Sequence, residues 1–234
     1  MEFIESIRHR AFDDLDVRGY DVDLTGWMST NSFTSLFSAA LDRLHGPRQV
    51  RKHHPVIVEV GTWKGLSAAT MARMCIDRGL KDARIVCVDT WLGSPEYYTQ
   101  AGIKRQDMGA SLKHVNGYPS VYFTFTKNMK KLKLDKAIAP LPLPSAQAYD
   151  VLKHHKVRAD IVYIDAAHEY EAVLLDIRKY YELLKPGGTM IGDDYHKTWP
   201  GVIKAVKEFC FNHQLDAVVD GSVWSLRKPC RKKK

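Results

Sequence analysis

The sequence has no apolar run near the length of about 20 residues that a helix needs to cross a bilayer. Its N-terminus, MEFIESIRHR, lacks the apolar core of a secretory signal peptide. Cysteine is scarce, and no C-x-x-C pair occurs among Cys75, Cys87, Cys210 and Cys230. These absences argue against a membrane span, a disulfide framework and a zinc site, so we expect a cytoplasmic protein with reduced thiols.

Positive charge is what the sequence has in excess. The formal net charge is +8, and much of the excess lies between Lys127 and Lys136 and in the C-terminal residues 227–234. Charge runs of this kind are usually solvated faces or chain ends. The tail also lacks interleaved aromatic residues that could stack on bases. A nucleic acid is therefore a less favoured partner.

Strand-like and helix-like patterns alternate along the 234 residues, which predicts one α/β domain with a largely parallel sheet. We expect residues 1–50 to form a helical cap or lid, 93–120 a substrate-side insertion, and 228–234 a basic tail. Strands are predicted at 56–60, 84–88, 137–141, 161–164 and 189–191, followed by a closing hairpin at 217–219 and 223–226. Helices are predicted near the start and at 32–44, 66–75, 122–132, 145 onward, 170–184 and 201–213.

A glycine-containing turn follows the first predicted strand, and Asp89 follows the second. Glycine lets a ligand approach the backbone N–H groups at the start of the next helix, where the helix dipole favours an anionic group. An acid at the tip of the neighbouring strand can accept the hydroxyls of a ribose. The glycines are Gly61 and Gly65 rather than the G-x-G-x-x-G pattern, which argues against a dinucleotide.

Acidic residues also end the fourth and fifth predicted strands. Asp165 follows one strand, with His168 three residues later, and Asp193 and Asp194 follow the next. Neighbouring parallel strands are about 4.8 Å apart, so these carboxylates should converge at one sheet edge. Clustered carboxylates repel one another unless a proton or a cation intervenes. Hard oxygen ligands suit Mg²⁺ or a similar divalent ion.

Residues 59–67, Glu-Val-Gly-Thr-Trp-Lys-Gly-Leu-Ser, together with Asp89, resemble the first motif and the ribose-binding acid of class I S-adenosylmethionine (SAM)-dependent methyltransferases. That resemblance implies a Rossmann-like fold: a mostly parallel seven-stranded sheet with an antiparallel last strand and helices on both faces. It implies SAM as cofactor, held by Glu59, Gly61, Thr62, Trp63, Gly65, Ser67, Asp89, Thr90, Trp91, Ser145, Gln147 and Asp165.

Three of these assignments have a structural alternative. Trp91 could pack on adenine or belong to the core. Ser145 and Gln147 resemble the polar pair that catechol O-methyltransferase-like enzymes set against adenine, but they could equally be a helix cap and a surface glutamine.

The second half of the chain is similar to divalent-dependent O-methyltransferases, and most of all to the macrolide-sugar and polysaccharide branch. The similarity rests on Asp165-x-x-His168-x-Tyr170 and on Asp193-Asp194-Tyr195. It implies Mg²⁺ on Asp165, Asp193 and Asp194, and His168 as the base that takes the hydroxyl proton. In the catechol enzymes a lysine stands in the place of His168, so a structural histidine stays an alternative.

The resemblance predicts a sugar or glycan hydroxyl as acceptor. The acceptor side is assigned to Trp27, Tyr195, His196 and Trp199, of which Trp27 and Trp199 could instead be core residues. The alternatives are a catechol or phenolic acceptor, a nucleic-acid methyltransferase and a non-catalytic SAM-binding module. Asp176, two helical turns beyond His168, is expected to be a surface acid or a partner of the region around Arg178. A homodimer is left open.

Overall fold

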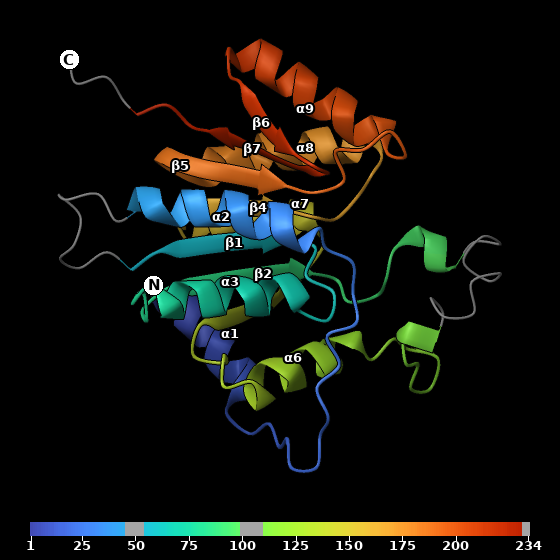
Figure 1. Cartoon of the computed structure of the whole chain (residues 1–234). Coiled ribbons are helices and arrows are strands. Elements are labelled where there is room, and N and C mark those ends of the chain that lie inside the picture. Colours follow the sequence, from blue (N-terminus) through green and yellow to red (C-terminus); the bar gives the residue numbers. More distant parts are fainter. Residues whose placement is uncertain (45–53, 99–109, 231–234) are drawn as a thin grey trace.

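The structure, a computed structural model, describes residues 1–44, 54–98 and 110–230 (Figure 1). The strands are β1 (Val56–Val60), β2 (Arg84–Asp89), β3 (Ile138–Pro142), β4 (Ala159–Ile164), β5 (Leu184–Gly192), β6 (Ala217–Asp220) and β7 (Val223–Arg227). The helices are α1 (Glu2–Phe12), α2 (Thr30–Leu44), α3 (Leu66–Asp77), the short 3-10 helix η1 (Pro95–Tyr97), α6 (Val121–Lys131), α7 (Ser145–His154), α8 (Tyr170–Leu183) and α9 (Pro200–His213).

One seven-stranded sheet runs through the molecule in the order β3-β2-β1-β4-β5-β7-β6. The pairs β1–β2, β2–β3, β1–β4 and β4–β5 are parallel, whereas β7 runs antiparallel to both β5 and β6. The predicted fold class is thereby confirmed. The strand order reverses between β1 and β4, and such a switch point is where open α/β sheets bind ligands.

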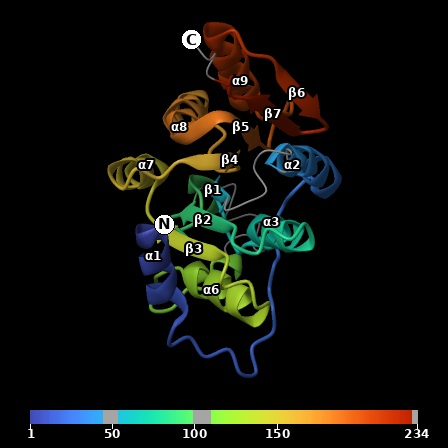
Figure 2. The same ribbon diagram turned by 90° about the vertical axis from the view of Figure 1, so that its left-hand side faces the viewer.

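Helices cover both faces of the sheet because the central strands are apolar on both sides. Val58 points into the core beneath α7, α8 and α9. Its neighbour Ile57 points into the core beneath α2, α3 and α6. Figure 2 shows the sheet between α7 and α8 on one side and α2 and α3 on the other. Alternate residues of a strand face opposite ways, so a continuous apolar run such as residues 56–58 requires cover on both faces.

The strand β5 is longer than the sequence pattern predicts. Residues 185–188, expected to be a loop, belong to it, because Leu184 pairs with Ala159 of β4. Beyond the end of β7, Lys228 N–H donates to the Gly188 carbonyl at 2.9 Å and its own carbonyl accepts from Gly187 N–H. On the β4 side the register shifts between Ala159 and Ile161, so residues 185–188 bulge there. Pairing with Lys228 on the other side keeps the Pro-Gly-Gly sequence in the strand.

The N-terminal helices belong to the two helical layers. Ile4 of α1 is buried with the α7–α8 core, and Phe33 of α2 is buried with the α3 core. The part of residues 1–50 that crosses the carboxyl ends of the strands is the segment between α1 and α2 (Figure 1). Much of the expected 93–120 insertion, and residues 231–234 of the tail, lie outside the described residues.

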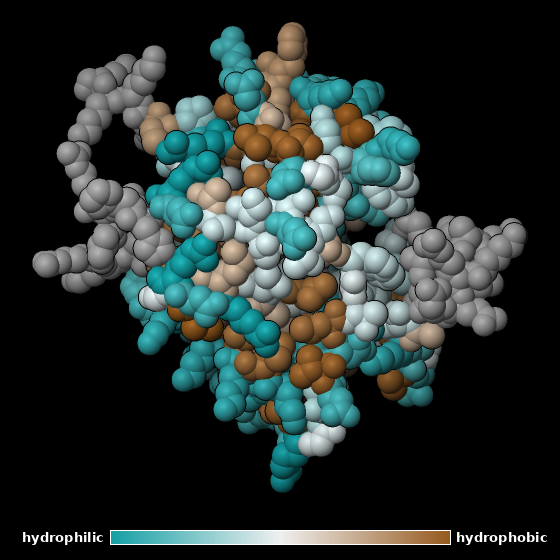
Figure 3. All heavy atoms as spheres, viewed as in Figure 1, coloured by the Kyte–Doolittle hydropathy of each residue, from teal (hydrophilic) through white to brown (hydrophobic). Residues whose placement is uncertain are grey.

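On the face seen in Figure 1, hydrophobic residues show as scattered groups between hydrophilic ones (Figure 3). Within the three described ranges, each helix is too short or too polar to cross a membrane.

Four parallel strands end at one level, and this places the site. Val60 pairs with Val88 of β2 and with Ile164 of β4, and Ile164 pairs with Gly192 of β5. The next residue along each strand, one step beyond that level, is Asp89, Gly61, Asp165 and Asp193 in the order of the sheet. The register therefore puts a glycine and three acids in a row.

Glycine is required at position 61 for two reasons. Its φ is +86°, and a Cβ built there would lie 1.8 Å from the carbonyl oxygen of Asp165. Gly79, at φ +75° after α3, has no atom within 4 Å of such a Cβ. Both glycines have a left-handed backbone, but only at Gly61 would a Cβ collide with neighbouring atoms.

We therefore expect Gly79→Ala to lower the free energy of unfolding by about 1–2 kcal/mol, the cost of an L-residue in the left-handed region. Gly61→Ala should cost about 3 kcal/mol more, at the upper end for overpacking. Urea unfolding followed by circular dichroism measures both. Equal losses in the two variants would contradict the close approach of β1 and β4.

Candidate active site

The turn after β1 is held by the acid at the tip of β2. Asp89 Oδ2 accepts hydrogen bonds from Thr62 N–H at 2.9 Å and from Trp63 N–H at 2.8 Å, while its Oδ1 accepts from Trp91 N–H at 2.7 Å. Trp63 has a left-handed backbone at φ +49°. The glycine turn and the predicted ribose acid are thus neighbours, as the sequence indicates.

Glu59 supports the turn from inside the protein. Its side chain is fully buried, and its two oxygens accept hydrogen bonds from the hydroxyls of Ser67 and Thr62. Burial raises the pKa of Glu59 to about 7, although these hydroxyls act in the opposite direction. The structure thus gives Glu59 and Ser67, both predicted to bind SAM, contacts that fix the turn.

The tryptophans near the turn differ in environment. Trp91 is 1% exposed, packs against Phe125 with ring centroids 5.0 Å apart, and donates its indole N–H to the Trp63 carbonyl at 2.7 Å. Its ring therefore belongs to the core, which corrects the alternative that it packs on adenine. Trp63 is half-buried and stacks on Tyr97 at 5.3 Å, so it is the aromatic ring beside the turn that keeps an open surface.

Two further predicted positions flank this half of the site. The hydroxyl of Thr90 is half-buried and accepts from Leu92 N–H at 3.2 Å. Gly65 has φ +91°, and a Cβ there would lie 2.6 Å from the Met129 Cε of α6. Gly65 is therefore needed for the packing of α3 on α6.

Ser145 and Gln147 do not form a matched pair. Ser145 hydrogen-bonds Asp176 of α8, and Gln147 is exposed on α7. Asp176 is 3% exposed, and burial raises its pKa to about 6. The expectation of a surface acid at Asp176 is therefore wrong: a helix face that looks polar in the sequence is covered by α7, and Ser145 satisfies the buried carboxyl group.

The acids after β4 and β5 lie close enough to influence one another. Burial raises the pKa of Asp165 well above its ordinary value, and the carboxylates of Asp193 and Asp194 raise it further. Asp165 also accepts a hydrogen bond from the Tyr163 hydroxyl at 3.1 Å. The sheet thus brings together the three acids that the sequence predicts to converge.

His168 is held between an acid and an aromatic ring. Its Nε2 lies 3.0 Å from Asp194 Oδ2, and its ring stacks on Trp199 with centroids 3.8 Å apart and an interplanar angle of 12°. Asp194 has φ +62°, a left-handed conformation that aspartate tolerates better than most residues. A neutral imidazole that donates Nε2–H to Asp194 keeps Nδ1 as its proton-accepting atom.

The same acids are occupied by protein donors. Asp193 Oδ1 accepts from the Ser222 hydroxyl at 2.6 Å and from Asp194 N–H at 2.8 Å. In the described part of the chain, no three His, Cys, Asp or Glu side chains are grouped so that they could hold a metal ion. The donor types and the raised pKa of Asp165 suit a hard cation, but the side chains are turned toward their own hydrogen-bond partners.

The predicted acceptor-side residues spread over several segments. Trp199 contacts His168, and Tyr195 packs at the edge of the core, its N–H bonded to the Ser222 carbonyl. His196 is exposed and pairs with the Thr198 hydroxyl at 2.9 Å. Trp27 is 64% exposed. The structure therefore joins Trp199 to the catalytic histidine candidate and shows no such contact for Trp27 or His196 among the described residues.

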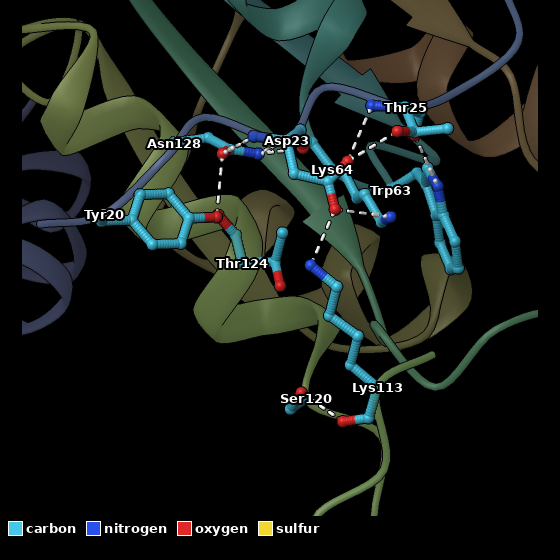
Figure 4. A network of polar contacts seen from close by, with 9 residues as sticks. All are labelled: Tyr20, Asp23, Thr25, Trp63, Lys64, Lys113, Ser120, Thr124 and Asn128. Carbon is cyan, nitrogen blue, oxygen red and sulfur yellow. Dashed lines mark hydrogen bonds and ion pairs between the residues drawn. The ribbon is translucent and has the colours of Figure 1, made fainter. Parts of the chain in front are cut away.

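The sequence did not predict a polar network that links the segment before α2 to the glycine turn after β1 (Figure 4). Residues 20–29, called the strap below, connect α1 with α2. Asp23 of the strap accepts hydrogen bonds from Lys64 of the turn at 2.9 Å and from Lys113 at 2.8 Å. Asn128 of α6 is fully buried between the strap and the turn. Lys64, a lysine inside the glycine turn, was the sequence signal that could have indicated this network. Asn128, which lies in a lysine-rich helix, gave no such signal.

Comparison with known proteins identifies the class. The profile of a methyltransferase-domain family matches residues 58–195, more than half of the 234 residues. The chain belongs to this family, and its sheet has the class I methyltransferase topology. The prediction of a class I SAM-dependent methyltransferase domain is thereby confirmed.

Particular relatives are distant. The uncharacterized protein R132 of Acanthamoeba polyphaga mimivirus is 26% identical over 153 residues, which cover 64% of this chain and 57% of that protein. The O-methyltransferase from Bacillus cereus, solved in complex with SAH, has a TM-score of 0.57 at 13% identity over 97% of this chain and 91% of its own. CalS11, a TDP-rhamnose 3'-O-methyltransferase, has a TM-score of 0.53 at 16% identity over 86% and 81%. These two likenesses establish the shared fold.

The raised pKa of Glu59 gives a stability prediction. The folded-state value of about 7 exceeds the ordinary 4.5, so the folded protein holds this proton where the unfolded chain releases it. The contribution to stability is complete below pH 4.5 and is lost as the pH rises through about 7. In thermal melts across this range, the melting temperature of Glu59→Gln should fall less steeply with rising pH than that of wild type.

A matched control is Glu171→Gln, which removes an exposed carboxylate on α8. It should keep the wild-type dependence of melting temperature on pH. Parallel curves for wild type and Glu59→Gln would mean that folding does not shift the pKa of Glu59.

Proposed function

We propose that this chain is a SAM-dependent O-methyltransferase that methylates a hydroxyl of a sugar or glycan with the help of Mg²⁺. The observation that carries the proposal is the row of Asp89, Gly61, Asp165 and Asp193 at the switch point, with His168 and Asp194 beside it. One half of the row has the groups that suit SAM. The other half has the groups that suit an alcohol and a divalent cation.

The cofactor half fits SAM in its chemistry. Bound there, SAM would supply an electrophilic methyl group on a sulfonium. The half-buried Asp89 carboxylate offers acceptors to ribose hydroxyls, and the start of α3, after Gly65, has backbone N–H groups without intrahelical partners. Trp63 offers an aromatic face. Glu59, buried beneath the turn, keeps Thr62 and Ser67 in place.

The acceptor half provides a proton acceptor and negative charge. His168 is oriented by Asp194 and Trp199, and its imidazolium would be stabilised by Asp194 once the ring has taken the hydroxyl proton. Asp165, Asp193 and Asp194 would hold Mg²⁺, which lowers the pKa of a bound hydroxyl. The support is the charge conflict at the half-buried Asp165, which a divalent cation would relieve.

A sugar hydroxyl is the favoured acceptor for two reasons. The pattern around Asp165, His168 and Asp193 resembles the macrolide-sugar and polysaccharide branch, and CalS11, which shares the fold, acts on TDP-rhamnose. We expect labelled SAM to transfer its methyl group to nucleotide-sugars or glycans rather than to catechols when Mg²⁺ is present. Transfer to catechol alone, or steeply salt-dependent transfer to RNA, would contradict this acceptor class.

Removal of the metal is the second test. EDTA should abolish most turnover, and added Mg²⁺ should restore it. Asp165→Asn and Asp193→Asn should each lower kcat by roughly 100-fold or more, because loss of a metal ligand removes the stabilisation of the alkoxide. Full turnover in EDTA would show that the three carboxylates serve another purpose. SAM binding without turnover on any acceptor would favour a binding module.

The role of His168 is tested separately. His168→Ala should lower kcat by roughly 100-fold or more, in the range for loss of a general base. The affinity for SAM, measured by calorimetry, should stay within about twofold because His168 lies in the acceptor half. His9→Ala, an exposed histidine on α1, is the control. A His168→Ala variant that loses SAM binding together with its fold would identify a structural histidine.

A further inference from the structure

A lysine is buried inside the glycine turn. Lys64 is 3% exposed, and its ammonium lies 2.9 Å from Asp23 Oδ2 of the strap. A buried ammonium is strongly unfavourable unless an opposite charge accompanies it. Asp23 is therefore the group that allows Lys64 to stay inside, and the two residues link the strap to the turn.

The link is reinforced by other donors to Asp23. Lys113, half exposed on the segment before α6, reaches the same oxygen at 2.8 Å, and the Thr25 hydroxyl donates to Oδ1 at 2.6 Å. These hydrogen bonds keep the pKa of Asp23 well below its ordinary value despite burial, which alone would raise it. Asp23 thus stays ionised and joins three segments that are distant in the sequence (Figure 4).

Asn128 clamps the same segments through their backbones. Its Nδ2 donates to the carbonyls of Asp23 at 2.6 Å and Lys64 at 2.9 Å. Its Oδ1 accepts from Asp23 N–H at 2.9 Å and from the Tyr20 hydroxyl at 3.0 Å. A carboxamide has two donors and two acceptor sites, and here all are used, so this buried side chain specifies one position of the strap against the turn.

The strap continues from the turn to the acids of the acceptor half. The Thr25 carbonyl accepts from the Trp63 indole at 3.1 Å. Four residues later, the Ser29 hydroxyl lies 2.7 Å from that of Ser222, which donates to Asp193. A single short segment thus contacts both halves of the proposed site.

We propose that Asp23 is a positioning residue for the cofactor: through Lys64 it holds the glycine turn, and with it the strap, in the arrangement that binds SAM. The proposal rests on the SAM binding proposed above. Without the ion pair, Lys64 turns toward solvent, and the turn loses the position in which Thr62 and Trp63 donate to Asp89.

The test compares Asp23→Asn with wild type by calorimetry against SAM and by hydrogen exchange without ligand. The dissociation constant for SAM should rise roughly ten- to a hundredfold, the range for one hydrogen bond to a charged group. Exchange should become faster for the amides of residues 61–65 and of the strap. Asp16→Asn is the matched control, because it removes an exposed ion pair with Arg18 between α1 and the strap and should change neither measurement.

The outcomes separate the two proposals. If Asp23→Asn folds and keeps both wild-type SAM affinity and wild-type exchange, the positioning role is wrong. If wild type itself does not bind SAM, the proposed function fails, while the exchange of residues 61–65 still decides the role of Asp23. If Asp23→Asn does not fold, Lys113→Gln replaces it as the test, because Lys113 is half exposed. We expect its dissociation constant for SAM to rise by roughly two- to fivefold. No change in that constant would refute the proposal.

Discussion

The hydrogen-bonded register of four parallel strands is the constraint on which the rest of the structure depends. Because Val60, Val88, Ile164 and Gly192 lie at one level, the chain leaves the sheet at four adjacent points. The residues that follow include three carboxylates, which would repel one another in water and do so more strongly when buried. Gly61 permits the close approach between β1 and β4 that the register demands, since any side chain would meet the Asp165 backbone.

Buried polar groups then determine how the turn is held. Glu59 supports it from the sheet, Asn128 from α6 and Asp23 from the strap. Each of these groups costs free energy to bury and is stable only while its partners are in place. Such a network favours one arrangement of the turn over its alternatives, and it thereby fixes where α3 begins relative to Asp89.

The acceptor half is organised differently. Asp193 is satisfied by Ser222, and Asp194 by His168, while the half-buried Asp165 has a pKa that both of them raise. The carboxylates are therefore coupled in energy and yet directed toward separate protein donors. Binding of a divalent cation would require them to exchange those donors for the ion, and the hydrogen bonds given up would lower the affinity for that ion.

Much of this could be predicted from the sequence because the signals are local or periodic. Apolar runs ending on Gly61, Asp89, Asp165 and Asp193 predict strands with acids at a common edge, and the register confirms it. The predicted strand boundaries were wrong where hydrogen bonds across the sheet outweighed the local preference for a turn, as at residues 185–188. The burial of Trp91 and Asp176 depends on which helix covers them, and a single sequence does not specify that.

The sequence by itself determined the fold class, the glycine turn and the row of acids, since each follows from strand periodicity and from the residue that ends each strand. Only the tertiary structure decided which polar side chains are partners. Asp23, Lys64 and Asn128 are far apart along the chain and look like surface residues. In the folded chain they form one network, in which Lys64 and Asn128 are buried and Asp23 is half-buried. A charged side chain needs an oppositely charged partner when it is buried, and only the folded chain determines which side chains are buried.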